Sequence, residues 1–274
     1  MELEKRILKI FNPLRQERSA LPASGEMKKT LYNFAPTRGR TLDVPANRRI
    51  LKLFATASVE MWQRAVHSFL ISASLVNISD IWSSIAGYYS SHFTVRAIAH
   101  LLGLYNLRQR RMTVTLQPSG TGFICQYREG RTNREHTFYW RRVKQDAFFS
   151  SNNLFAENDE DAEFSDAGHR NFATYIDHLN GFQSFHPLNM DQLKKRIEQI
   201  SKMEIHSFQL PSKSNYPDLD SVQIVAYHRL VFYRELIDQL VDNNNFWSVH
   251  RDPSWCRDII NFQRVQPRTI ELGR

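Results

Sequence analysis

The sequence predicts a mainly α protein with a small antiparallel β insertion, that is, an α+β fold. Apolar residues recur at steps of three and four through most of residues 49–107 and again through 219–241, as in amphipathic helices. Between these segments, residues 111–149 are rich in β-branched and aromatic side chains and contain glycine turns, which is typical of short strands. With 274 residues, the chain is long enough to bury a full hydrophobic core.

The first segment, residues 1–48, is expected to form a basic N-terminal arm. A short helix from Leu3 to Leu14 would end near Pro13, and irregular chain with loop-forming residues would follow it. Residues 49–274 are then expected to form one helical domain, interrupted by the β insertion at about 111–149.

Two long helices are predicted within 49–107. The first covers about 49–76 and carries an apolar stripe of Val59, Trp62, Val66, Phe69, Leu70 and Ala73. Ser79 or Asp80 suits the N-cap of the second helix, and Gly103 suits its C-cap near residue 102. Because so few residues separate the two helices, they should pack antiparallel.

Three strands are predicted in the β insertion, from the runs MTVTLQ, FICQYR and HTFYWRRV. Since alternate residues of a strand face opposite ways, Phe138 and Trp140 would enter the core while Tyr139 and Arg141 would lie outside. Nine Lys or Arg against two acids lie between Arg108 and Lys144, so an exposed face of this sheet would be cationic.

The rest of the chain predicts further helices and one acidic loop. Helical segments are expected at 167–179, 190–203 and 219–241. The last of these is apolar around most of its circumference, which favours either a central core helix or a subunit interface. Residues 157–166 hold six acids and are expected to form an exposed loop or, alternatively, an intramolecular mimic of phosphate.

Composition and charge limit the classes of function that the chain can have. The chain is 42% hydrophobic and 23% charged, as folded proteins are. Cys125 and Cys256 form no CxxC pair, the apolar stretches are far shorter than a membrane helix, and the N-terminus lacks a signal-peptide pattern. We therefore expect a cytoplasmic protein that crosses no membrane. Lys and Arg exceed the acids, 36 against 28, and the net charge of +8 suits a polyanionic partner.

The basic β insertion is the predicted nucleic-acid-binding site. Aromatic rings interleaved with cations can stack bases and hold phosphates. The candidate residues are Arg128, Arg131, Arg134, Tyr139, Arg141 and Lys144. The alternative is an ordinary half-buried sheet with a solvated basic face.

The segment from Trp82 to Leu104 resembles a helix of the HEPN superfamily. Members of this family often have a YYSxF-like run, an Arg-Ala pair, and then small and leucine residues, after a long amphipathic helix. The matching residues here are Tyr88, Tyr89, Ser90, Phe93, Arg96, Ala97, Leu101 and Leu102. The resemblance covers about residues 49–107. It implies a HEPN-like helical bundle that dimerises and is either a metal-independent ribonuclease or a catalytically silent relative, in a toxin–antitoxin or antiphage system.

The catalytic signature of that family is an Arg followed, after four to six intervening residues, by a His. Arg170 and His178 come nearest, with seven residues between them. On a helix, a step of eight places two side chains about 80° apart, against about 20° for a step of seven. Such a pair suits RNA cleavage, because His can transfer a proton while Arg stabilises charge on the phosphate. Alternatively, Arg170 neutralises the acidic run before it and His178 caps or lines a helix end.

A second pair, Arg96 and His100, lies at i and i+4 on one face of the predicted helix. The spacing is too short for the family signature, and we expect Arg96 to make a buried ion pair or hydrogen bonds within the bundle. His228 and His250 have no His or Cys at metal-ligand spacing, and the common nucleotide and hydrolase motifs are absent from the sequence. We therefore expect no metal and no cofactor.

Two functions remain as predictions. The first is a metal-independent endoribonuclease acting through Arg170 and His178. The alternative is a noncatalytic RNA- or DNA-binding or assembly subunit of a defence complex. In both, we expect RNA rather than DNA as the nucleic acid, a homodimer, and a protein partner such as an antitoxin.

Overall fold

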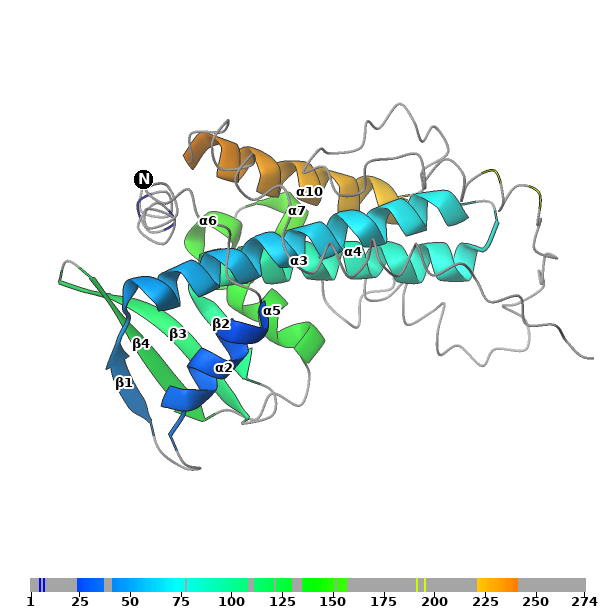
Figure 1. The fold of residues 1–274 in the computed structure, drawn as a ribbon. Helices are drawn as coiled ribbons and strands as arrows, with labels where there is room; N and C mark the ends of the chain where they lie inside the picture. The colour runs from blue at the N-terminus through cyan, green and yellow to red at the C-terminus, as the bar shows by residue number, and fades with distance from the viewer. Residues whose placement is uncertain are drawn as a thin grey trace, which may run out of the picture.

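The computed structural model describes residues 5, 7, 24–36, 41–76, 78–107, 111–120, 122–129, 135–150, 152–156, 191, 195 and 221–240. Within them the protein is mostly helical, with one small antiparallel sheet of four strands. Three long helices, α3 (Arg48–Leu75), α4 (Asp80–Leu101) and α10 (Ser221–Leu240), lie side by side, and the sheet lies at one end of this bundle (Figure 1). The predicted α+β class is confirmed.

Helices α3 and α4 form the antiparallel hairpin that their short connection predicts. In the first half of α3, Ser58 donates its hydroxyl hydrogen to the carbonyl of Ala97, near the end of α4, over 2.7 Å. At the other end of the hairpin, Ser72 and Ser83 each donate to the other's backbone carbonyl, over 2.6 and 2.9 Å. The N-cap of α4 is Ser79, as expected, and Leu102 is its C-cap.

Helix α10 packs against both members of the hairpin through buried polar contacts. The hydroxyls of Tyr233 and Ser58 are 2.8 Å apart, and Trp62 donates its indole N–H to the carbonyl of Leu230 over 3.2 Å. The side-chain amide of Gln223 donates to the two hydroxyls of the Ser72 and Ser83 pair, over 3.0 and 2.7 Å. The prediction of a helix at 219–241 is therefore confirmed, and the face of α10 that carries these residues belongs to the core.

The sheet consists of β1 (Leu42–Pro45), β2 (Leu104–Leu107), β3 (Met112–Ser119) and β4 (Gly122–Glu129). Its order is β1-β4-β3-β2, and all three neighbouring pairs are antiparallel. The β3–β4 hairpin confirms the first two predicted strands. The edge strands β1 and β2 were not expected, because four residues are too few to show a periodicity of their own.

The expectation of irregular chain after residue 14 is wrong for two segments. Residues Ser24–Phe34 form the helix α2, and β1 joins the sheet beside β4. The hydroxyl of Tyr127, on β4, donates to the carbonyl of Leu31, on α2, over 3.2 Å. Of the predicted Leu3–Leu14 helix, the structure describes Lys5 and Ile7, and both are helical.

The third predicted strand is also wrong. Residues Glu135–Lys144 form the helix α5, which is followed by the short helices α6 (Ala147–Ser150) and α7 (Asn153–Ala156). Tyr139, Trp140 and Val143 are buried, at the i, i+1 and i+4 spacing of a helix face. The β-branched and aromatic content of this segment raised its strand propensity, but packing against the bundle decides its conformation.

A buried arginine connects α10 to these short helices. Arg229 is 3% exposed and donates from Nε to the carbonyl of Leu154 over 2.7 Å and from a terminal nitrogen to the hydroxyl of Ser91 over 2.9 Å. Its guanidinium also lies 4.9 Å from the ring centroid of Trp140, on α5. Four helices therefore meet at one side chain, and this contact fixes the position of α5 against the bundle.

Several expectations fall on other parts of the chain. The predicted helix at 167–179 and the acidic run at 157–166 lie outside the described residues, and of the segment 190–203 only Asp191 and Lys195, both helical, are described. In the part of the chain that the structure describes, no helix is long and apolar enough to cross a membrane.

Candidate nucleic-acid interface

The predicted binding residues are divided between β4, α5 and segments that the structure does not describe. Arg128 is exposed on β4, Arg141 is exposed on α5, and Lys144 is half-buried at the end of α5. The other two predicted arginines, Arg131 and Arg134, lie outside the described residues, as do both members of the predicted catalytic pair, Arg170 and His178.

The expectation that Tyr139 faces solvent is wrong. On α5 its side chain is fully buried, and its hydroxyl accepts a hydrogen bond from the backbone N–H of Asn106 over 3.2 Å. The guanidinium of Arg96 lies 5.2 Å from the centroid of the Tyr139 ring. Both faces and the polar end of this ring lie inside the protein, so Tyr139 is not placed to stack on a base.

The last turn of α5 carries three cations. Arg141, Arg142 and Lys144 lie there, while the buried side chains of Trp140 and Val143 face the core. Cations in a last turn also stabilise the helix dipole by about 0.3–1 kcal/mol each, a role that requires no ligand. The sequence places Arg142 among the cations of this basic, aromatic-rich segment, although the candidate binding residues do not include it.

The strand register places Arg128 on the face of the sheet that adjoins α5. Thr113 is paired with Arg128, and Thr115 with Gln126. Directly paired residues lie on one face of an antiparallel sheet, and alternate residues of a strand share that face. Arg128 therefore lies on the same face as Thr115 and Gln117. We call the surface that carries Arg128, Arg141, Arg142 and Lys144 the basic surface.

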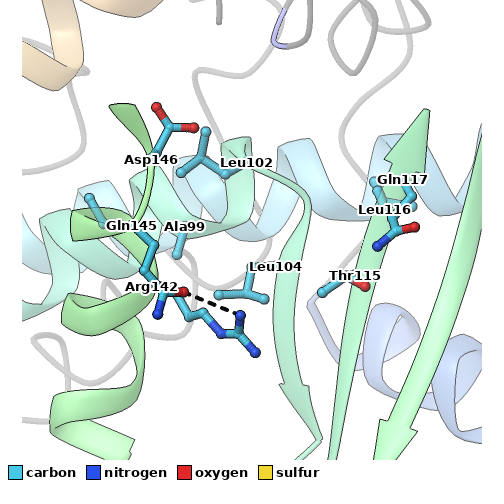
Figure 2. A pocket seen from close by; sticks show the side chains of 10 residues that line it. Ala99, Leu102, Leu104, Thr115, Leu116, Gln117, Arg142, Gln145 and Asp146 are labelled. Atoms are coloured by element: carbon cyan, nitrogen blue, oxygen red, sulfur yellow. Dashed lines mark hydrogen bonds between the residues drawn. The ribbon is translucent and has the colours of Figure 1, made fainter. Parts of the chain in front are cut away.

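A pocket with a volume of about 230 Å³ lies between α5, the end of α4 and strands β2 and β3. Figure 2 shows Arg142 and Gln145 on one side of it, with Thr115 and Gln117 on the other. Its apolar walls are formed by Ala99, Leu102, Leu104, Leu116 and Val143. The polar residues of its lining are Arg142, Gln145, Asp146, Thr115 and Gln117, of which Arg142, Gln145 and Gln117 are exposed. Because Arg142 lines the pocket and belongs to the basic surface, the pocket adjoins that surface.

The junction of α4 and β2 holds two walls of the pocket together. Gly103 has φ +75°, a conformation that glycine adopts without steric cost. Its carbonyl accepts a hydrogen bond from the N–H of Leu116 over 2.7 Å, and its N–H donates to the carbonyl of His100 over 2.9 Å. The expectation that Gly103 ends the helix is confirmed, and this turn directs Leu104 toward the pocket.

In the second Arg–His pair of the sequence, Arg96 is half-buried and His100 lies in the interior. His100 is fully buried, and its Nδ1 donates to the carbonyl of Leu104 over 2.8 Å. Burial lowers the pKa of His100 to about 3, and the charge of Arg96 contributes to the decrease. The imidazole is therefore neutral at physiological pH and does not reach solvent, so this pair is unsuited to proton transfer with RNA.

Neither a metal site nor a reactive thiol is present among the described residues. These residues contain no group of three or more His, Cys, Asp or Glu side chains that could hold a metal ion. Burial raises the pKa of the Cys125 thiol to about 12, so this cysteine is not a thiolate nucleophile at neutral pH.

Comparison with known proteins adds no relative to this description. No protein-family model, no curated protein and no solved structure matches the chain.

Proposed function

We propose that this chain is an RNA-binding protein and that RNA binds along the basic surface. The observation that carries the proposal is a pocket lined by the exposed Arg142, with the exposed Arg141 next to it on α5 and the exposed Arg128 on the sheet face that contributes Thr115 and Gln117 to the pocket. Guanidinium groups hold phosphate oxygens through paired hydrogen bonds, and their charge releases counterions from the nucleic acid. The net charge of +8 supports the same class of partner.

RNA is proposed over DNA because of the pocket and the resemblance to HEPN proteins. Proteins that recognise RNA mostly bind unpaired nucleotides, which can enter a pocket as a base pair cannot. The HEPN resemblance of residues 49–107 supports a cytoplasmic role in toxin–antitoxin or antiphage defence. It also supports a homodimer, which size exclusion with light scattering would test; a monomer at all concentrations would contradict that part of the proposal.

Binding without cleavage is the form of the proposal that the described residues favour. The buried, neutral His100 offers no accessible acid or base to a bound RNA. A metal-independent endoribonuclease remains the second candidate, on the motif-like spacing of Arg170 and His178 in the sequence.

An incubation in EDTA separates these two functions. Purified protein is mixed with labelled total RNA, in parallel with the Arg170→Ala and His178→Ala variants. We expect retarded but intact RNA with all three proteins. Cleavage by the wild type that both substitutions abolish would contradict the noncatalytic form and establish the endoribonuclease.

The binding site is tested with a double substitution on the exposed face of α5. Arg141→Ala together with Arg142→Ala should weaken RNA binding by about tenfold or more, since each charge-assisted hydrogen bond contributes about 1.5–3 kcal/mol when fully made and less at an exposed site. The matched control is Arg64→Ala, which removes one exposed arginine from α3. Equal affinity of the wild type and the double variant would contradict the proposed surface.

A further inference from the structure

We propose that the pocket between α5 and β3 binds one unpaired nucleotide of the RNA, with the base inside and its phosphate at Arg142. This inference rests on the proposed RNA-binding function and specifies what the site recognises. A duplex could contact the basic surface, but its paired bases could not enter the pocket.

Size and wall chemistry point to a base. Pockets for drug-sized ligands have volumes of about 300–1,000 Å³. The volume of about 230 Å³ is smaller and suits a single ring system. Leu102 and Leu104, which are 8% and 7% exposed, contribute aliphatic surface to the walls, so a planar base entering from solvent would bury part of one face against carbon.

The phosphate would bind at Arg142. One terminal nitrogen of Arg142 donates to Oε1 of Gln145 over 3.3 Å, which orients the guanidinium at the pocket rim. A guanidinium has five N–H groups, so it can donate to a phosphate while keeping this contact. The amide nitrogen of Gln145 adds two donors beside it. This end of the pocket is therefore rich in donors and suits an anion.

The opposite end of the pocket suits the amino edge of a base. Figure 2 shows the carboxylate of Asp146 and the guanidinium of Arg142 at opposite ends of the lining residues. Asp146 Oδ1 accepts a hydrogen bond from the backbone N–H of Phe148 over 3.1 Å, which restrains the side chain. A carboxylate has several acceptor sites, and it pairs readily with the exocyclic amine of cytosine. Adenine and guanine carry such an amine too, whereas uracil does not, so the pocket should favour the amine-bearing bases, adenine and cytosine among them, over uracil.

The test compares five labelled RNAs in EDTA: single strands of A, C and U, an abasic strand of the same length, and a duplex. The wild type should bind the A and C strands at least about tenfold more tightly than the abasic strand and the duplex. Gln117→Trp, at an exposed position of the pocket lining, should fill the pocket and remove the preference for the A and C strands over the abasic strand. Asp146→Asn retains an acceptor for the N–H of Phe148, and it should reduce the advantage of A and C over U.

The results distinguish the failure of this inference from failure of the proposed function. Equal binding of all five RNAs, still sensitive to Arg141→Ala with Arg142→Ala, would overturn the pocket and leave the basic surface intact. Binding of no RNA would overturn both. If free AMP and CMP bind as tightly as the strands and compete with them, the pocket is a site for free nucleotides, and its assignment to RNA is overturned.

Discussion

Replacing Gly103 by alanine should destabilise the protein more than the same substitution at any other turn glycine that the structure describes. A Cβ at this position would lie 2.6 Å from Cβ of Leu116 and 3.4 Å from its Cα. These atoms are at or next to the backbone of β3, which the 2.7 Å hydrogen bond to the Gly103 carbonyl holds in place. The strand must therefore move.

The loss of stability expected for Gly103→Ala has two parts. A left-handed conformation costs an L-residue about 1–2 kcal/mol, and overpacking a filled site costs about 1–3 kcal/mol. Their sum of about 2–5 kcal/mol is a large part of the 5–15 kcal/mol by which a typical domain is stable. Gly120→Ala is the matched control, because Gly120 has φ +55° but a Cβ there would meet nothing within 4 Å. It should show only the conformational part.

Urea unfolding followed by far-ultraviolet circular dichroism measures both variants. We expect Gly103→Ala to lose at least about 1 kcal/mol more than Gly120→Ala, the lower limit of the overpacking cost. Equal losses in the two variants would refute the argument that Leu116 and Gly103 are held in close contact.

Three further substitutions test the interior. The pKa of His100 is about 3 in the folded protein and 6.5 ordinarily. Between pH 3 and pH 6.5, the unfolded chain therefore binds a proton at His100, whereas the folded protein does not. Stability should therefore fall as pH decreases from 6.5 to 3, by up to about 1.4 kcal/mol per pH unit from this group, and His100→Gln should make the decrease measurably shallower in acid titration of the unfolding free energy. Arg229→Met leaves a buried carbonyl and hydroxyl without their donor and should cost about 2–4 kcal/mol in urea unfolding; an unchanged midpoint would contradict its connecting role. Gly87→Ala places a methyl 2.8 Å from Cγ1 of Val222 on α10, so it should lower the melting temperature by several degrees. A higher melting temperature in this variant would show that α4 and α10 can move apart without loss of stability.

The helical hairpin and the β3–β4 hairpin could be predicted because their signals are local. The apolar periodicity of α3 and α4 extends over many turns, and Ser79 and Gly103 mark the ends of α4 at the residues where the structure places them. The strands of the hairpin alternate around a turn that contains Gly120. In each case the residues that form the element also carry its pattern.

The elements that sequence reasoning missed depend on distant contacts. Strand β1 is four residues long and exists through its pairing with β4, which lies far along the chain. Helix α5 combines a strand-like composition with a helical burial pattern, and the choice is made by Arg229 and the backbone of Asn106. Such contacts produce no recognisable pattern in the sequence of the segment itself.

The candidate site, like the fold, could be predicted from the sequence only in part. The basic character of Arg128 and Arg141 is visible in the sequence, and both are exposed in the structure. The pocket is not visible there, because Leu104, Thr115 and Gln145 come from three separate elements. The false assignment of Tyr139 follows directly from reading α5 as a strand, since strand alternation placed its ring outside.

The salt dependence of RNA binding tests the central claim most directly. The logarithm of the dissociation constant for an unpaired RNA is measured against the logarithm of the salt concentration, in EDTA, for the wild type and for Arg141→Ala with Arg142→Ala. Since each phosphate contact to a single strand contributes about 0.7 to this slope, the double variant should have a slope smaller by about 1.4. Identical slopes for the two proteins, or a wild-type affinity that does not change with salt, would contradict RNA binding along the basic surface.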